Sequence, residues 1–219
     1  FISYRLYLKF MTVQINYKNG GLKNIIGNLV LFVGEKFNIK PLKTHISDQE
    51  FSFVNDLLKT GDLKKNILTF DFNSKKKIIL VNIKDKSSSS DVENLGAELY
   101  DFIKNNKITN LAINSNSLKA KPDRNFIGRF LHGLKLKSYE FNKYKTKKEK
   151  KITNINIYGD KVKSSSQNKL KFKALEEGSF FARDLVSEPG NILHPDEYAK
   201  RINSLKKIGL KINIYDEKK

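Results

Sequence analysis

The sequence predicts an α/β fold with a mainly parallel sheet flanked by helices. Short segments with alternating or continuous apolar residues, typical of strands, take turns with longer segments whose apolar residues recur every three or four positions, as on a helix. Strands are expected at 13–17, 28–33, 68–72, 76–83, 108–113 and 152–158. Helices are expected between Ser47 and Gly61, from Ser90 to Ile103, from Asp123 to Leu134, and at 167–186 and 195–208. Strands that alternate with helices favour parallel pairing.

Two kinds of strand are distinguishable. The run NLVLFV at 28–33 has no polar alternation and is bounded by Gly27 and Gly34, which is typical of a strand covered on both faces. The segment at 68–72 alternates instead, and the turn at Asn73-Ser74 predicts that it forms a hairpin with 76–83.

Several helix starts carry capping residues. Ser47 and Glu50 form a capping-box pair, and Gly61 is expected to end that helix. A second box is expected at Ser90 and Glu93, so the serine run at 87–90 is interpreted as a loop that leads into a helix. Asp123 is expected to cap the helix that follows it.

The longest predicted helix spans 167–186. Four of its residues share one face: Leu175, Gly178, Ala182 and Leu185. The two small residues of this face would let another element approach closely, and we expect a connector packed on both sides. Ser164 and Gln167 are expected to cap its start, and Pro189 prevents its continuation.

Residues in and after this helix carry a family signature. They are Ala174, Gly178, the run Ala182-Arg183-Asp184-Leu185, Pro189, Asn191, Pro195 and Ala199. This order resembles the segment in which leucyl aminopeptidases, a cytosolic two-metal family, pass from their N-terminal domain into the catalytic domain. Ser187 stands where the family usually has an asparagine, and Gly190 where a second proline or an alanine is common. Arg183 and Asp184, about 100° apart on a helix, are expected to form separate salt bridges.

The resemblance implies a domain organisation. A macro-domain-like α/β domain is implied at 11–160, a connector helix at 161–190, and the truncated start of a second α/β domain, the metallopeptidase catalytic domain, at 191–219. Residues 1–10 precede Met11, the single methionine, and are expected to be a non-native upstream segment.

The resemblance also implies an activity. The whole enzyme would be a cytoplasmic homo-hexamer that releases N-terminal amino acids from peptides by hydrolysis at two divalent metal ions, manganese or zinc. The implied metal ligands lie downstream of residue 219, so this fragment is expected to be inactive, and its signature residues are expected to be structural.

Motifs for chemistry agree with that expectation. The three histidines, His45, His132 and His194, are far apart, and the sequence has no HExxH motif, no cysteine and no Gly-x-Ser-x-Gly nucleophile motif. We therefore assign no catalytic residue and no metal ligand to this chain.

The net charge of +19, from 42 Lys plus Arg against 23 Asp plus Glu, leaves two interpretations. Lysine outnumbers arginine and Asn, Ile and Phe are abundant, as an AT-rich genome would impose on any protein. Alternatively, the chain is a macro-like module that binds a nucleotide or nucleic acid through its basic surface. Nucleic-acid binding that comes from lysine charge alone is expected to be non-specific. The basic run KYKTKKEKK at 143–151, with Tyr139, Phe141 and Tyr144 beside it, is either a solvated loop or a phosphate-binding patch. A third interpretation, a structural fragment of unrelated origin, leaves the signature to coincidence.

The C-terminal residues 195–214 are expected to form one helix and one strand. Pro195 suits the first position of a helix, Gly209 is expected to stop that helix, and the alternation at 210–214 predicts a last strand. We expect Leu185, Ile202, Leu205 and Ile212 to need cover from the rest of the catalytic domain. No apolar run approaches the roughly 20 residues of a membrane span, so we expect no membrane insertion.

Overall fold

The computed structural model describes residues 13–18, 25, 27–118, 125–146, 152–159 and 166–215. The chain divides into two compact units, Phe1–Glu176 and Glu177–Lys219. The division falls inside one continuous helix, α5, which runs from Ser166 to Ser187.

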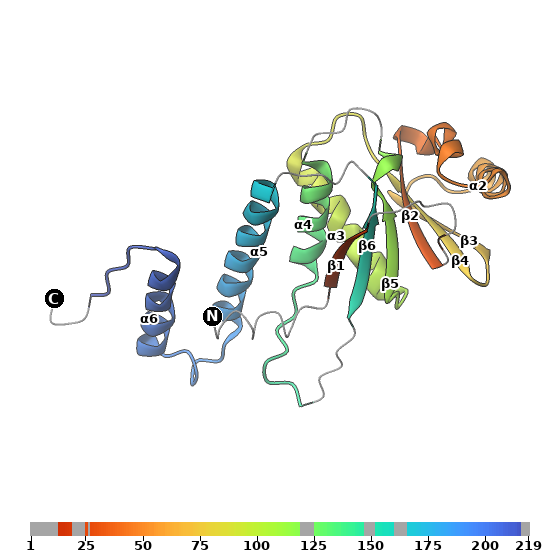
Figure 1. Ribbon diagram of the computed structural model, residues 1–219. Coiled ribbons are helices and arrows are strands. Elements are labelled where there is room, and N and C mark those ends of the chain that lie inside the picture. The colour runs from red at the N-terminus through yellow and green to blue at the C-terminus, as the bar shows by residue number, and fades with distance from the viewer. Residues whose placement is uncertain are drawn as a thin grey trace. The chain divides into compact units, whose positions relative to one another are not determined.

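The first unit is built on a six-stranded sheet in the order β1-β6-β5-β2-β4-β3 (Figure 1). The strands are β1 Val13–Lys18, β2 Gly27–Val33, β3 Ile67–Asn73, β4 Lys76–Asn82, β5 Asn110–Asn114 and β6 Thr153–Tyr158. Four of the five pairings are parallel, and β3 with β4 is the antiparallel one. The predicted α/β class, the mainly parallel sheet and the hairpin are confirmed.

Helices cover both faces of this sheet. The helices of the first unit are α2 Asp48–Thr60, α3 Ser89–Asn105, α4 Phe126–Lys137 and the first half of α5, and short 3₁₀ turns lie at Glu35–Phe37, Lys40–Thr44 and Ser115–Ser117. Figure 1 shows α3 and α4 on one side of the sheet and α2 on the other. Val30 and Phe32 belong to the core under α3 and α4, whereas Leu29, Leu31 and Val33 belong to the core under α2.

β2 therefore has a continuous apolar sequence because both of its faces are buried. None of the residues from Leu29 to Val33 is more than 4% exposed. The Phe32 ring meets the rings of Phe126 and Phe130 edge-on at centroid distances of 5.7 and 5.2 Å, which anchors α4 to the centre of the sheet.

The capping predictions have mixed outcomes. The Ser47–Glu50 box at the start of α2 is confirmed, with the Glu50 N–H 3.2 Å from Ser47 Oγ and the Ser47 N–H 3.0 Å from Glu50 Oε2. The box predicted at Ser90 and Glu93 is wrong, because α3 is capped by Ser88 and Asp91. A serine run offers several frames for a box, and the shorter aspartate side chain also reaches the backbone N–H of Ser88, at 2.8 Å.

Two other predicted caps cannot be compared with the structure. Asp123 and Ser164 lie outside the described residues. Within the described part, α4 begins after Asn125, whose side chain makes no capping hydrogen bond.

Helices α3 and α4 touch backbone to backbone. A Cβ atom added at Gly96 would lie 1.9 Å from the Phe130 carbonyl oxygen, and one added at Gly133 would lie 1.9 Å from the Glu93 carbonyl oxygen. Each helix thus supplies one glycine to the crossing, and only glycine fits at either place.

The predicted buried face of α5 is wrong. Leu175 is 47% exposed, Ala182 is exposed, and a Cβ atom at Gly178 would meet nothing within 4 Å in the described chain. Of the four predicted residues only Leu185 is buried, and the other described buried residues of the helix are Glu176 and Phe180. The spacing of apolar residues could not predict that Glu176 is buried, because burial of a carboxylate is stable only when a cation pairs with it.

The second unit contains the end of α5, then α6 from Pro195 to Asn203 and a 3₁₀ turn from Ser204 to Ile208. Gly209, with φ of +93°, ends this turn as predicted. The strand predicted at 210–214 is wrong, since residues 210–215 pair with no strand in the described chain. A segment with alternating apolar residues forms a strand only where a neighbouring strand supplies its hydrogen-bond partners.

The glycine contact gives a test of the fold. Gly133→Ala should lower the free energy of unfolding by about 1–3 kcal/mol, because the new methyl group overlaps the Glu93 carbonyl. Gly178→Ala is the matched control: it fills open space in a helix and should stabilise by up to about 1 kcal/mol. Urea unfolding followed by circular dichroism measures both; equal effects would contradict a close α3–α4 crossing.

Candidate functional site

The seven signature residues from Ala182 to Pro195 all lie in the second unit. Ala182, Arg183, Asp184 and Leu185 occupy the last turns of α5, Pro189 and Asn191 lie in the loop after it, and Pro195 is the first residue of α6. Leu185 is buried, Asp184 is half-buried and the other five are exposed. The structure thus gathers them on one helix–loop–helix segment, and their structural role stays a prediction.

Backbone hydrogen bonds shape the loop. The Glu188 N–H donates to the Asp184 carbonyl at 3.1 Å, which carries the α5 hydrogen-bond ladder to its last member before Pro189. The Pro189 carbonyl then accepts from the N–H groups of both Ile192 and Leu193, at 2.9 and 3.0 Å. Pro189 therefore ends the helix and organises the turn that follows, consistent with its missing N–H and intact carbonyl.

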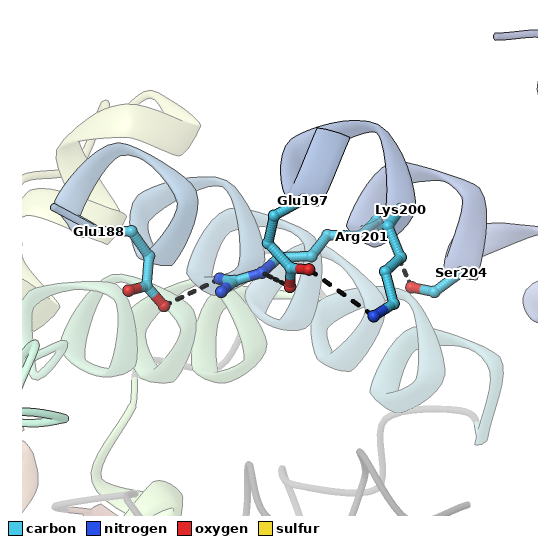
Figure 2. Close-up of polar contacts among 5 residues, drawn as sticks. All are labelled: Glu188, Glu197, Lys200, Arg201 and Ser204. Atoms are coloured by element: carbon cyan, nitrogen blue, oxygen red, sulfur yellow. Dashed lines mark hydrogen bonds and ion pairs between the residues drawn. The ribbon is translucent and has the colours of Figure 1, made fainter. Parts of the chain in front are cut away.

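A charged network ties α6 back to the end of α5 (Figure 2). Arg201 Nη1 lies 2.8 Å from Glu188 Oε1, and Arg201 Nε lies 3.0 Å from Glu197 Oε1. Figure 2 shows the guanidinium between the two carboxylates, and the Glu188 side chain is only 1% exposed. The Arg201 fork can hold two carboxylates at once because its N–H donors are fixed in one plane.

The network also sets the protonation of its members. The hydrogen bond from Arg201 holds the pKa of Glu197 below its usual value of 4.5, and the hydrogen bonds to Glu188 and Glu197 raise the pKa of Arg201. A lowered carboxyl pKa means that the contribution of Glu197 to stability is present above pH 4.5 and is lost as the pH falls through the lower folded value. Glu197 and Arg201 are therefore both charged at neutral pH.

Sequence reasoning did not single out Glu188 or Arg201. The i,i+4 spacing of Glu197 and Arg201 is a readable signal for an ion pair on one helix. The contact between Glu188 and Arg201 joins two helices across a proline-containing turn, so it depends on a loop geometry that no spacing rule predicts.

The three histidines stand on separate elements. His45 follows a 3₁₀ turn, His132 is buried on α4, and His194 precedes α6. Among the described residues, no group of three or more His, Asp or Glu side chains is arranged to hold a metal ion. The residues present therefore do not fit the two metal ions that the family resemblance implies. In the same described part of the chain, no helix has the length and apolar character needed to cross a membrane.

The first unit has one open hollow of about 320 Å³ beside the start of β3. It is lined by Lys64, Lys65, Asn66, Ile67, Glu98 and Phe102. The Asn66 amide already donates to both carboxylate oxygens of Glu98, at 3.1 and 3.0 Å, so these two side chains are engaged with each other.

Comparison with known proteins now decides the family. The profile of the N-terminal domain of the cytosol aminopeptidase family matches residues 32–148, which is more than half of the chain. The chain belongs to the cytosol aminopeptidase family. This match begins at Phe32, near the end of β2, and includes β3, β4, β5 and the helices α2, α3 and α4.

Individual relatives carry the name of the same family. A "Probable cytosol aminopeptidase" of Wolbachia pipientis is 32% identical over 151 residues, which cover 65% of this chain and 29% of the relative. A protein of the same name from Rickettsia canadensis is 25% identical over 222 aligned residues, which cover 94% of this chain and 44% of the relative. The chain thus spans less than half the length of these relatives.

A solved structure shows the same fold. A tomato leucine aminopeptidase mutant superposes with a TM-score of 0.69 and 22% sequence identity, over 94% of this chain and 45% of the tomato chain. The likeness reaches beyond residues 32–148, because 94% of the chain is more than the segment that the family profile matches.

The charged network predicts a local effect of mutation. Arg201→Met should destabilise the second unit by about 1.5–3 kcal/mol, since the buried Glu188 carboxylate loses the guanidinium that neutralises it. Lys200→Met is the matched control, because Lys200 is 81% exposed and 3.8 Å from Glu197. Limited proteolysis at residues 188–195 should accelerate in the first variant only. Equal cleavage of the two variants would mean that Arg201 does not secure the loop.

Proposed function

We propose that the protein acts as a metal-dependent leucyl aminopeptidase that releases N-terminal amino acids from peptides in the cytoplasm. The observation that carries this proposal is the family match at 32–148, supported by the signature segment. Two divalent ions, manganese or zinc, would activate a water molecule and polarise the peptide carbonyl. The described residues offer no such ligand set, so we propose that the ligands belong to further sequence of the full-length protein.

The residues of this chain would then provide structure. We propose an N-terminal domain at 11–160, a connector at 161–190 and the beginning of a catalytic domain at 191–219. The second unit exposes large apolar side chains: Val186 88%, Ile208 75%, Leu210 52% and Tyr215 76%. Such side chains are more typical of contact surfaces than of free surface, and we propose that the catalytic domain and a homo-hexamer cover them.

Activity should separate the chain from the full-length enzyme. The full-length gene product should hydrolyse leucine p-nitroanilide with manganese or zinc and lose activity with a chelator, whereas the 219-residue chain should show no turnover under either condition. Chelator-sensitive turnover by the purified chain would contradict the proposal. If the full-length protein hydrolysed none of the aminoacyl substrates tested, the proposed activity would be contradicted.

A second candidate function is a module for binding a nucleotide or nucleic acid. The observation that favours it is Tyr144, which is 50% exposed in a basic segment, with Lys143 Nζ 5.4 Å from its ring centroid and the Phe141 ring 5.8 Å away. Exposed aromatic rings among cations are typical of surfaces on which bases stack. Lys147–Lys151 of the basic run lie outside the described residues.

Salt dependence tests this candidate. Without a dedicated module, binding to a fluorescent single-stranded oligonucleotide should be independent of sequence and should weaken steeply between 50 and 200 mM salt, by about tenfold or more, because lysine–phosphate contacts act through counterion release. Fluorescence anisotropy measures both properties, with Tyr144→Ser reporting the contribution of stacking. Sequence-selective binding that persists in 200 mM salt would instead identify a dedicated nucleic-acid module.

A further inference from the structure

One stripe of α5 packs along α4 within the first unit. Asn168 Nδ2 donates to Asn125 Oδ1 at 2.6 Å. One turn later, the Phe172 ring fills the space above Gly128, where a Cβ atom would lie 2.5 Å from Cε2 of that ring. The next position on the stripe is Glu176. Residues four apart on a helix lie on one face, so these three side chains form a single row.

The row ends in a buried charge. Glu176 is 4% exposed, and its Oε2 lies 2.8 Å from Lys135 Nζ on α4. Its Oε1 lies 3.6 Å from His132 Nδ1, an atom with no hydrogen-bond partner among the described residues. The pKa of Tyr17, on β1, is raised by its partial burial and by the negative charge of Glu176. Among the described residues, Lys135 is the cation closest to the carboxylate.

The position of Glu176 along the chain gives this contact its meaning. Glu176 is the last residue of the first compact unit, and α5 continues without a break to Ser187. Lys171, Lys173 and Leu175, on the other faces of the same turns, are exposed. The stripe that packs on α4 thus ends in one ion pair. Elsewhere on this half of the helix, Lys169 Nζ lies over the Tyr17 ring of β1, 4.4 Å from its centroid.

We propose that the Glu176–Lys135 pair is a latch that fastens the first half of α5 to α4 and can open while the sheet stays folded. The latch depends on charge: a carboxylate that is almost fully buried needs its cation, and without that cation the helix gains by releasing the carboxylate to water. Since α5 carries residues 182–185 of the signature, the latch fixes the helix from which that segment continues. The proposal rests on these contacts and not on peptidase activity.

An ordinary structural ion pair makes a different prediction. Loss of such a pair lowers the stability of the whole unit, so the helix and the sheet become less protected together. A latch releases α5 alone. Hydrogen exchange at individual backbone amides distinguishes the two, because local and global opening affect different sets of amides.

The experiment compares two lysines of α4. In the 219-residue chain, Lys135→Met should reduce the exchange protection of amides 170–176 at least tenfold and leave those of β4 unchanged. Lys137→Met is the matched control, because its pair with Asp101 is half exposed, with each side chain 49% exposed, and it should change neither set. Mass spectrometry of exchanged peptides or NMR gives both readouts.

A double variant tests the dependence on charge. Lys135→Met combined with Glu176→Met replaces the ion pair by apolar groups and should restore protection at 170–176 to within about threefold of the starting protein, as other buried pairs tolerate such replacement. The proposal is overturned by unchanged protection of α5 in Lys135→Met, by an equal loss of protection in β4, or by a double variant as open as the single one.

Discussion

Burial of β2 on both faces is the constraint on which the rest of the first unit depends. This strand pairs with β4 on one edge and β5 on the other, so its own side chains can only point into cores above and below the sheet. Two layers of helices are then required to cover a strand with no polar face. The α3–α4 crossing meets this need on one side by bringing two helix backbones into contact at Gly96 and Gly133.

The sequence was sufficient for elements whose pattern reports their own surroundings. The six strands of the sheet and the helix that begins at the Ser47–Glu50 capping box were predicted. Burial of one face produces a periodic pattern of apolar residues, and a capping box is a pair of residues at a fixed spacing. Predictions failed where the decisive partner is distant in sequence. The alternation at 210–214 implied a strand, but no strand lies beside it in the described chain. The serine run permitted more than one capping frame, and local pattern could not select Ser88 over Ser90.

The candidate site shows the same division. The roles of Pro189 and Pro195 could be predicted because proline lacks a backbone N–H and has a fixed φ. Pro189 follows the end of α5, and Pro195 is the first residue of α6. The ion pair between Glu188 and Arg201 could not be predicted, since its partners are thirteen positions apart, one directly after α5 and the other on α6. A glutamate in a polar loop has no local mark of burial, yet the Glu188 side chain is almost completely enclosed.

Buried carboxylates explain how so basic a chain joins its elements. Three glutamates with side chains no more than 7% exposed each meet a cation from another element: Glu50 with Lys76, Glu176 with Lys135, and Glu188 with Arg201. Burial would raise the pKa of Glu50, but the hydrogen bonds from Lys76 and Ser47 lower it below its usual value, so the Glu50 carboxylate is charged at neutral pH. With 42 cationic residues and 23 acidic ones, carboxylates are the scarcer partner. Each of the three buried glutamates secures a junction between two elements: α2 to β4, α5 to α4, and the end of α5 to α6.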